Sequence, residues 1–66
     1  MPKNLALKIA IVESGLTQFE VAAAAGIHHT RLSHIINGHR EASEDEQRAL
    51  ARVLKRKIGQ LFLKVA

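Results

Sequence analysis

Apolar residues recur along this chain at the spacing of an α-helix, in segments that glycine and capping residues separate. In the first segment, Leu5, Ile9 and Val12 stand at i, i+4 and i+7, which is one face of a helix. Leu7 and Ile11 widen this stripe. A glycine follows, as is common where a helix ends. The pattern predicts a helix over about residues 3–14.

The next two segments predict a helix, a sharp turn and a second helix. Thr17 and Glu20 have the spacing of a capping box, in which each side chain binds a backbone N–H at the start of a helix. Strong helix formers follow as far as Gly26, which ends the helix. The second helix has apolar residues on one side and stops at Asn37-Gly38. Its other side carries His29, Thr30, Ser33 and His34.

The last third of the chain has the same helical character. Ser43 and Glu46 form a second capping box, and apolar residues at helical spacing follow as far as Leu54. The tail repeats this spacing from Ile58 to Val65. No segment alternates with the period of a strand. We therefore predict an all-α fold of five helices that forms one domain over residues 1–66.

The stretch from Gln18 to Asn37 is the most informative one. Its apolar residues fall where two steeply crossed helices would meet, and Ala22 stands where the helices would approach most closely. Gly26 stands where the turn needs a left-handed residue. This is the helix-turn-helix arrangement of many DNA-binding proteins.

Five short stretches carry a resemblance to a known family, and they are Gly15-Leu16-Thr17-Gln18, Glu20-Val21-Ala22, Gly26-Ile27, Leu32-Ser33 and Ile36-Asn37-Gly38. Through them the chain resembles the phage-repressor-like, xenobiotic-response-element type of helix-turn-helix domain. The likeness extends from the first helix to Leu61-Phe62 and implies a five-helix bundle of the lambda-repressor-like type, with the motif at the second and third helices.

The resemblance implies which residues of the motif contact DNA bases and which contact DNA phosphates. The outward face of the second motif helix would lie in the major groove and contact bases. Helix ends and flanking cations would contact phosphates, which helix N-termini attract. The implied base-contacting residues are His29, Thr30, Ser33 and His34. The implied phosphate-contacting residues are Gln18, Arg31, Asn37 and Arg40.

The sequence departs from the family at two places. Many members pair an arginine in helix one with a glutamate before Asn-Gly, whereas Ile11 and Ile36 stand here. Since both partners are apolar, no buried charge is left alone. Members often have a glycine, an apolar residue and a Ser or Thr between helices four and five, where this chain has Lys55-Arg56-Lys57. Either two helices or one continuous, bent helix from Ser43 toward Leu63 fits this stretch.

Charge and composition narrow the range of partners. The 66 residues include 10 Lys and Arg against 6 Asp and Glu, a formal charge of +4, which favours nucleic acid first and an acidic membrane second. There is no cysteine, which excludes disulfides and thiolate metal sites. No apolar run approaches the ~20 residues of a membrane span, and we find no cleavable signal. We expect a cytoplasmic protein that does not bind membranes.

Enzyme and cofactor functions find little support in the sequence. No serine has the context of a nucleophile, the acidic residues cluster in first turns of helices, and no glycine-rich phosphate loop exists. The four histidines lack the i, i+4 spacing of a helical metal pair. We expect no catalytic residue, metal, cofactor or small-molecule ligand. Histidines gain charge below neutral pH, so DNA affinity should rise modestly as pH falls.

The chain end is rich in apolar residues, which suggests a contact between two copies. The predicted dimer residues are Leu61, Phe62, Leu63 and Val65. The alternative is that they only close a small core.

These observations favour a sequence-specific regulator of transcription that binds double-stranded DNA as a homodimer and acts as a repressor. One alternative is a protein-interaction module on the same scaffold, such as an antitoxin or a coactivator-like partner. The other is a general nucleic-acid binder, for which a charge of +4 is modest.

Overall fold

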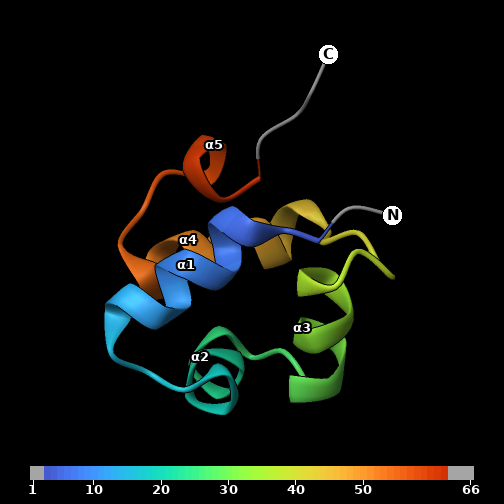
Figure 1. Ribbon diagram of the computed structural model, residues 1–66, viewed down its shortest axis with the longest axis horizontal. Coiled ribbons are helices and arrows are strands. Elements are labelled where there is room, and N and C mark those ends of the chain that lie inside the picture. Colours follow the sequence, from blue (N-terminus) through green and yellow to red (C-terminus); the bar gives the residue numbers. More distant parts are fainter. Residues whose placement is uncertain (1–2, 63–66) are drawn as a thin grey trace.

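Five helices surround one hydrophobic core in the computed structural model, which describes residues 3–62 (Figure 1). Over these residues the chain forms no strand, and the predicted all-α fold is confirmed. The helices α2 and α3 lie next to each other at one end of the molecule, and α5 lies at the other end (Figure 1). The helices are α1 (Leu5–Ser14), α2 (Gln18–Ala25), α3 (His29–Ile36), α4 (Glu44–Leu54) and α5 (Ile58–Leu61).

Both predicted capping boxes are present. At the start of α2, the Thr17 hydroxyl accepts from the Glu20 N–H at 3.1 Å, and the Glu20 carboxylate accepts from the Thr17 N–H at 2.9 Å. At the start of α4, Ser43 and Glu46 make the same pair of bonds, at 3.2 and 2.8 Å. These bonds occupy N–H groups that have no partner inside the helix.

The first helix differs from its prediction in both its start and its buried face. It begins at Leu5, because the Asn4 side chain caps it by accepting from the Leu7 N–H at 3.0 Å. The buried residues are Leu7, Ala10 and Ile11. Of the predicted stripe, Leu7 and Ile11 are therefore buried, whereas Leu5, Ile9 and Val12 lie on the opposite side and are 59%, 55% and 71% exposed.

Asn4 also joins three parts of the chain. Its backbone N–H donates to the Ile36 carbonyl at 2.7 Å, and its side-chain amide donates to the Leu61 carbonyl at 2.9 Å. The ends of α3 and α5 are thereby bonded to the start of α1. The sequence interpretation gave Asn4 no role. Its cap on the Leu7 N–H is a local signal that the interpretation missed, whereas its bonds to Ile36 and Leu61 join residues far away along the chain.

The core supports the predicted crossing of α2 with its neighbours. Ala22 is 1% exposed, as expected where helices approach closely. Ile11 and Ile36 are both buried among apolar side chains. The buried set is Leu7, Ala10, Ile11, Val21, Ala22, Ile27, Leu32, Ile35, Ile36, Leu50, Leu54 and Leu61.

The fourth and fifth helices are separate, so the alternative of one continuous helix is wrong. Lys55 follows α4 in the left-handed conformation, with φ 55°, and turns the chain out of the helix. The Arg56 N–H then closes the end of α4 by donating to the Ala51 carbonyl at 3.0 Å. The Arg56 guanidinium contacts Glu13 at 2.9 Å, and this contact links the end of α4 to α1.

Candidate nucleic-acid interface

The turn between α2 and α3 sets the angle of the two motif helices. Gly26 ends α2 in the left-handed conformation, with φ 72°. The Ile27 N–H donates back to the Ala22 carbonyl at 2.9 Å, and the Ile27 side chain enters the core. His28 caps α3, because its Nδ1 accepts from the Thr30 N–H at 3.2 Å. Histidine thus takes the place where serine or threonine is more usual.

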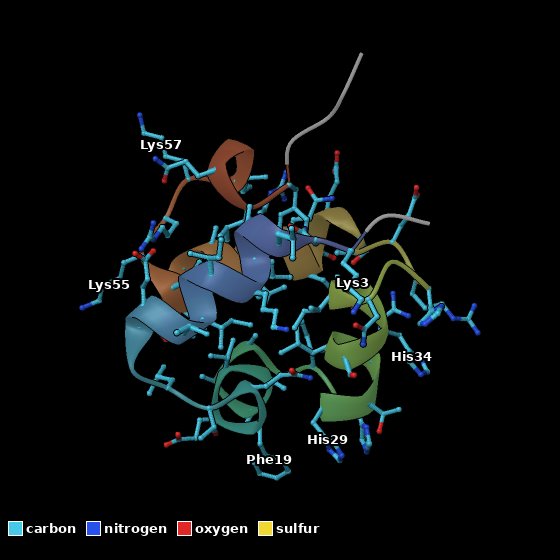
Figure 2. The ribbon with its side chains drawn as sticks, in the orientation of Figure 1. Lys3, Phe19, His29, His34, Lys55 and Lys57 are labelled. Atoms are coloured by element: carbon cyan, nitrogen blue, oxygen red, sulfur yellow. The ribbon has the colours of Figure 1, made fainter. Side chains whose placement is uncertain are left out.

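The outer side of α3 carries the four residues that the resemblance assigns to bases. His29, Thr30 and His34 are exposed, and Ser33 is half-buried. Leu32 and the residues at its helical spacing face the core instead. Figure 2 shows His29 and His34 projecting from α3 away from the body of the molecule. The side chains of His29, Thr30 and His34 are therefore accessible to a ligand, whereas that of Ser33 is partly covered and its hydroxyl accepts from the Asn37 amide at 3.4 Å.

The residues assigned to phosphates lie at the start of α2, on α3 and after α3. Gln18, the first residue of α2, and Arg40, beyond α3, are both exposed. Asn37 is half-buried directly after α3, where its amide donates to the Ser33 carbonyl at 2.9 Å. Asn37 is thus oriented by the last turn of α3, in a chain whose Ile36 cannot serve as a polar anchor.

Arg31 is engaged within the protein. Its guanidinium binds the Glu46 carboxylate through two nitrogens, and the Nη2–Oε1 distance is 2.8 Å. Hydrogen bonding from Arg31, supported by the Ser43 bonds, lowers the pKa of Glu46 to about 2. The same contact raises the pKa of Arg31. This pair joins α3 to the first turn of α4 and balances the Arg31 charge.

The predicted dimer residues differ in burial, and the structure describes only two of the four. Leu61 is 1% exposed and packs in the core of its own chain, and Phe62 is half-buried against the same core. Leu61 therefore closes the core, as the alternative interpretation held. Leu63 and Val65 lie outside the described residues.

The sequence interpretation missed one prominent side chain of this surface. Phe19, in the first turn of α2, is 63% exposed, and its ring centroid lies 5.3 Å from that of His29. The available signal was an aromatic residue directly after Gln18, at a first-turn position that points outward.

Among residues 3–62, no helix has the length and apolar character needed to cross a bilayer. Over residues 3–62, no three potential ligand side chains gather closely enough to hold a metal ion.

Comparison with known proteins identifies the family. A sequence model of the helix-turn-helix family matches residues 7–61. Curated protein sequences give no match. Among solved structures, the restriction-modification controller protein C.AhdI from Aeromonas hydrophila superposes with a TM-score of 0.84 at 24% identity, over 89% of each chain. The clp gene regulator ClgR from C. glutamicum superposes with a TM-score of 0.79 at 22% identity, over 88% of this chain and 75% of its own. The chain belongs to the helix-turn-helix family, and its fold is the lambda-repressor-like bundle that the sequence predicts.

Proposed function

We propose that this protein is a sequence-specific regulator of transcription that inserts α3 into the major groove of double-stranded DNA. The observation that carries the proposal is the exposed polar side of α3, formed by His29, Thr30, Ser33 and His34. A major groove about 12 Å wide admits one helix with its side chains. Two structural neighbours are named as a controller and a gene regulator, which supports a regulatory role.

The proposed form on DNA is a homodimer. Two copies would place their α3 helices one DNA turn apart, about 34–36 Å, on a near-palindromic site. The molecule measures 30 × 22 × 21 Å, so two copies side by side fit that spacing. Occupancy of a site beside a promoter would block polymerase sterically, and this makes the protein a repressor without any catalytic step.

The first experiment is selection of binding sites from random duplexes at physiological salt. An enriched inverted repeat with half-sites one turn apart is the expected result. A single enriched half-site would retain sequence specificity and remove the dimer. No enrichment would contradict the proposal, and the motif would then be a scaffold for a protein partner or a general nucleic-acid binder.

Substitutions test the assigned roles on the selected site. Gln18→Ala and Asn37→Ala should weaken binding to all duplexes similarly, because phosphates carry no sequence information. Thr30→Ala and His34→Ala should change which site is preferred, with about 1–3 kcal/mol of discrimination lost at the affected base pair. Uniform weakening by all four substitutions would contradict the assignment.

A further inference from the structure

Three aromatic rings form a row in space from the first turn of α2 to the start of α3. They are Phe19, His29 and His28. The ring centroids of Phe19 and His29 are 5.3 Å apart with the planes tilted by 44°, and His29 and His28 stack at 4.7 Å. Figure 2 shows Phe19 and His29 beside each other, both pointing away from the core. Phe19 is 63% exposed, so a large apolar side chain remains in water in the free protein.

An open hollow of about 310 Å³ adjoins these rings. Apart from two imidazoles, the side chains that form it are apolar. They are Phe19, Ala22, Ala23, Ile27, His28 and His29. Ala22 and Ile27 belong to the core and give the hollow a firm floor. Because the alanines are short, a small apolar group could reach that floor. We call this hollow the Phe19 notch.

The notch lies within the proposed DNA surface. Gln18, assigned to a phosphate, directly precedes Phe19 in α2, and Thr30, assigned to a base, directly follows His29 in α3. A duplex that contacts both residues would pass over the notch. The apolar feature of base edges in the major groove is the C5-methyl group of thymine. The same methyl group is present on 5-methylcytosine.

We propose that the Phe19 notch binds the C5-methyl group of a pyrimidine in the major groove, which makes Phe19 a specificity-determining residue. This inference rests on the proposed function and goes beyond it, because it names the chemical group that an otherwise unassigned surface recognises. Burial of one methyl group contributes about 0.8 kcal/mol, so the methyl should raise affinity about 4-fold.

The test replaces each thymine of the selected site, one at a time, by deoxyuridine, which lacks only the methyl group. We expect one position in each half-site at which the replacement lowers affinity about 4-fold. If uracil and thymine bind equally at every position, the inference is overturned, although the selected site itself upholds the proposed function. If selection finds no site, the proposed function and this inference both fail.

Variants connect the methyl effect to Phe19. With Phe19→Ala, the difference between thymine and uracil should disappear at that position, whereas Phe19→Leu should retain part of it. Ile9→Ala is the matched control, because Ile9 is also an exposed apolar residue, on α1, and does not line the notch. A methyl effect of unchanged size in Phe19→Ala would assign the recognition to another residue and overturn the inference.

A second set of duplexes distinguishes the two sources of the methyl group. The sensitive thymine·adenine pair is replaced by cytosine·guanine, with and without a methyl group at cytosine C5. If the wild-type protein binds the methylated duplex about 4-fold more tightly, the notch reads the methyl group on either base. If methylation has no effect, the notch is restricted to thymine. A methylation effect that persists in Phe19→Ala would contradict the assignment to the notch.

Discussion

One carboxylate, that of Glu46, serves two structural purposes. It completes the capping box of α4 by accepting from the Ser43 N–H at 2.8 Å, and it binds the Arg31 guanidinium of α3. The Glu46 side chain is only 17% exposed, whereas that of Arg31 is 43% exposed. This partial burial reduces the screening by water that makes most surface ion pairs weak. We therefore expect the pair to contribute to stability.

The prediction for Glu46 follows from the sign of its pKa shift. Because folding lowers the pKa of Glu46 from 4.5 to about 2, the pair stabilises the folded state above about pH 4.5, and this stabilisation is lost as pH falls toward 2. Glu46→Gln should therefore lower the free energy of unfolding by about 1–2 kcal/mol at pH 7 and change it little at pH 2. Urea denaturation at both pH values measures the difference.

A matched control for this substitution is available in the same helical turn. Asp45→Asn also removes one negative charge from the first turn of α4, but the Asp45 side chain is 95% exposed and lies 3.9 Å from Arg48. It should change stability by no more than a few tenths of a kcal/mol. Equal effects of the two substitutions would show that the helix dipole, and not the Arg31 contact, is responsible.

Lys55 is the one non-glycine residue among positions 3–62 with a positive φ, 55°. A side chain in this conformation brings its Cβ close to the following carbonyl, at a cost of about 1–2 kcal/mol. Lys55→Gly removes this strain, but glycine loses more conformational freedom on folding, which offsets part of the gain. The net increase in the free energy of unfolding should be about 0.5–1 kcal/mol. A thermal melt should show the midpoint raised by about 2–8 °C. Lys55→Ala keeps the strained Cβ and should melt close to the wild type.

Among the elements, α1 shows where periodicity alone misleads. Apolar residues lie on two opposite sides of this helix, so a 3.6-residue spacing fits either side. The predicted stripe of Leu5, Ile9 and Val12 satisfies the spacing as well as the buried set does. Contacts with α3, α4 and α5 decide which side is buried, and these contacts involve residues far away along the chain.

Two matched substitutions test this orientation of α1. Ile11 is 6% exposed and Ile9 is 55% exposed, so removing one methyl group should matter only at Ile11. Ile11→Val should lower the free energy of unfolding by about 0.5–1.5 kcal/mol, and Ile9→Val by less than about 0.5 kcal/mol. Chemical denaturation followed by circular dichroism measures both. A larger loss for Ile9→Val would mean that the opposite side of α1 is buried.

The starts of α2 and α4 were predictable from the sequence, for a physical reason. A cap such as Thr17 or Ser43 binds an N–H three residues away, so the signal is local and readable in sequence. Lys55 carries no such signal, since it occupies a position that favours glycine. The bond from Asn4 to the Leu61 carbonyl spans 57 positions, and only the folded chain reveals it.

The candidate interface also has one part that the sequence predicts and another part that only the folded chain reveals. The outward side of α3 follows from helical spacing within that helix, and the structure exposes it. The Phe19 notch and the Arg31–Glu46 pair each join side chains from different elements, so no single segment could indicate them.

Across the whole molecule, cations lie both near α3 and far from it. Arg40 follows α3, whereas Lys55 and Lys57 lie on the opposite side of the molecule from His29 and His34 (Figure 2). Only cations that contact phosphates release counterions when DNA binds. The salt dependence of binding therefore reports which side of the protein faces DNA.

The last prediction concerns the slope of log affinity against log salt concentration. Each phosphate neutralised by a cation contributes about 0.9 to that slope, so Arg40→Ala should reduce it by about 0.9 for each bound chain. Gln18→Ala and Asn37→Ala should lower affinity without changing the slope, because amides carry no charge. Lys57→Ala is the control and should change neither quantity. Titrations of one duplex between 50 and 200 mM salt measure all four variants. A slope that falls with Lys57→Ala and stays constant with Arg40→Ala would place DNA on the side away from α3, and the groove assignment of α3 would then have to be abandoned.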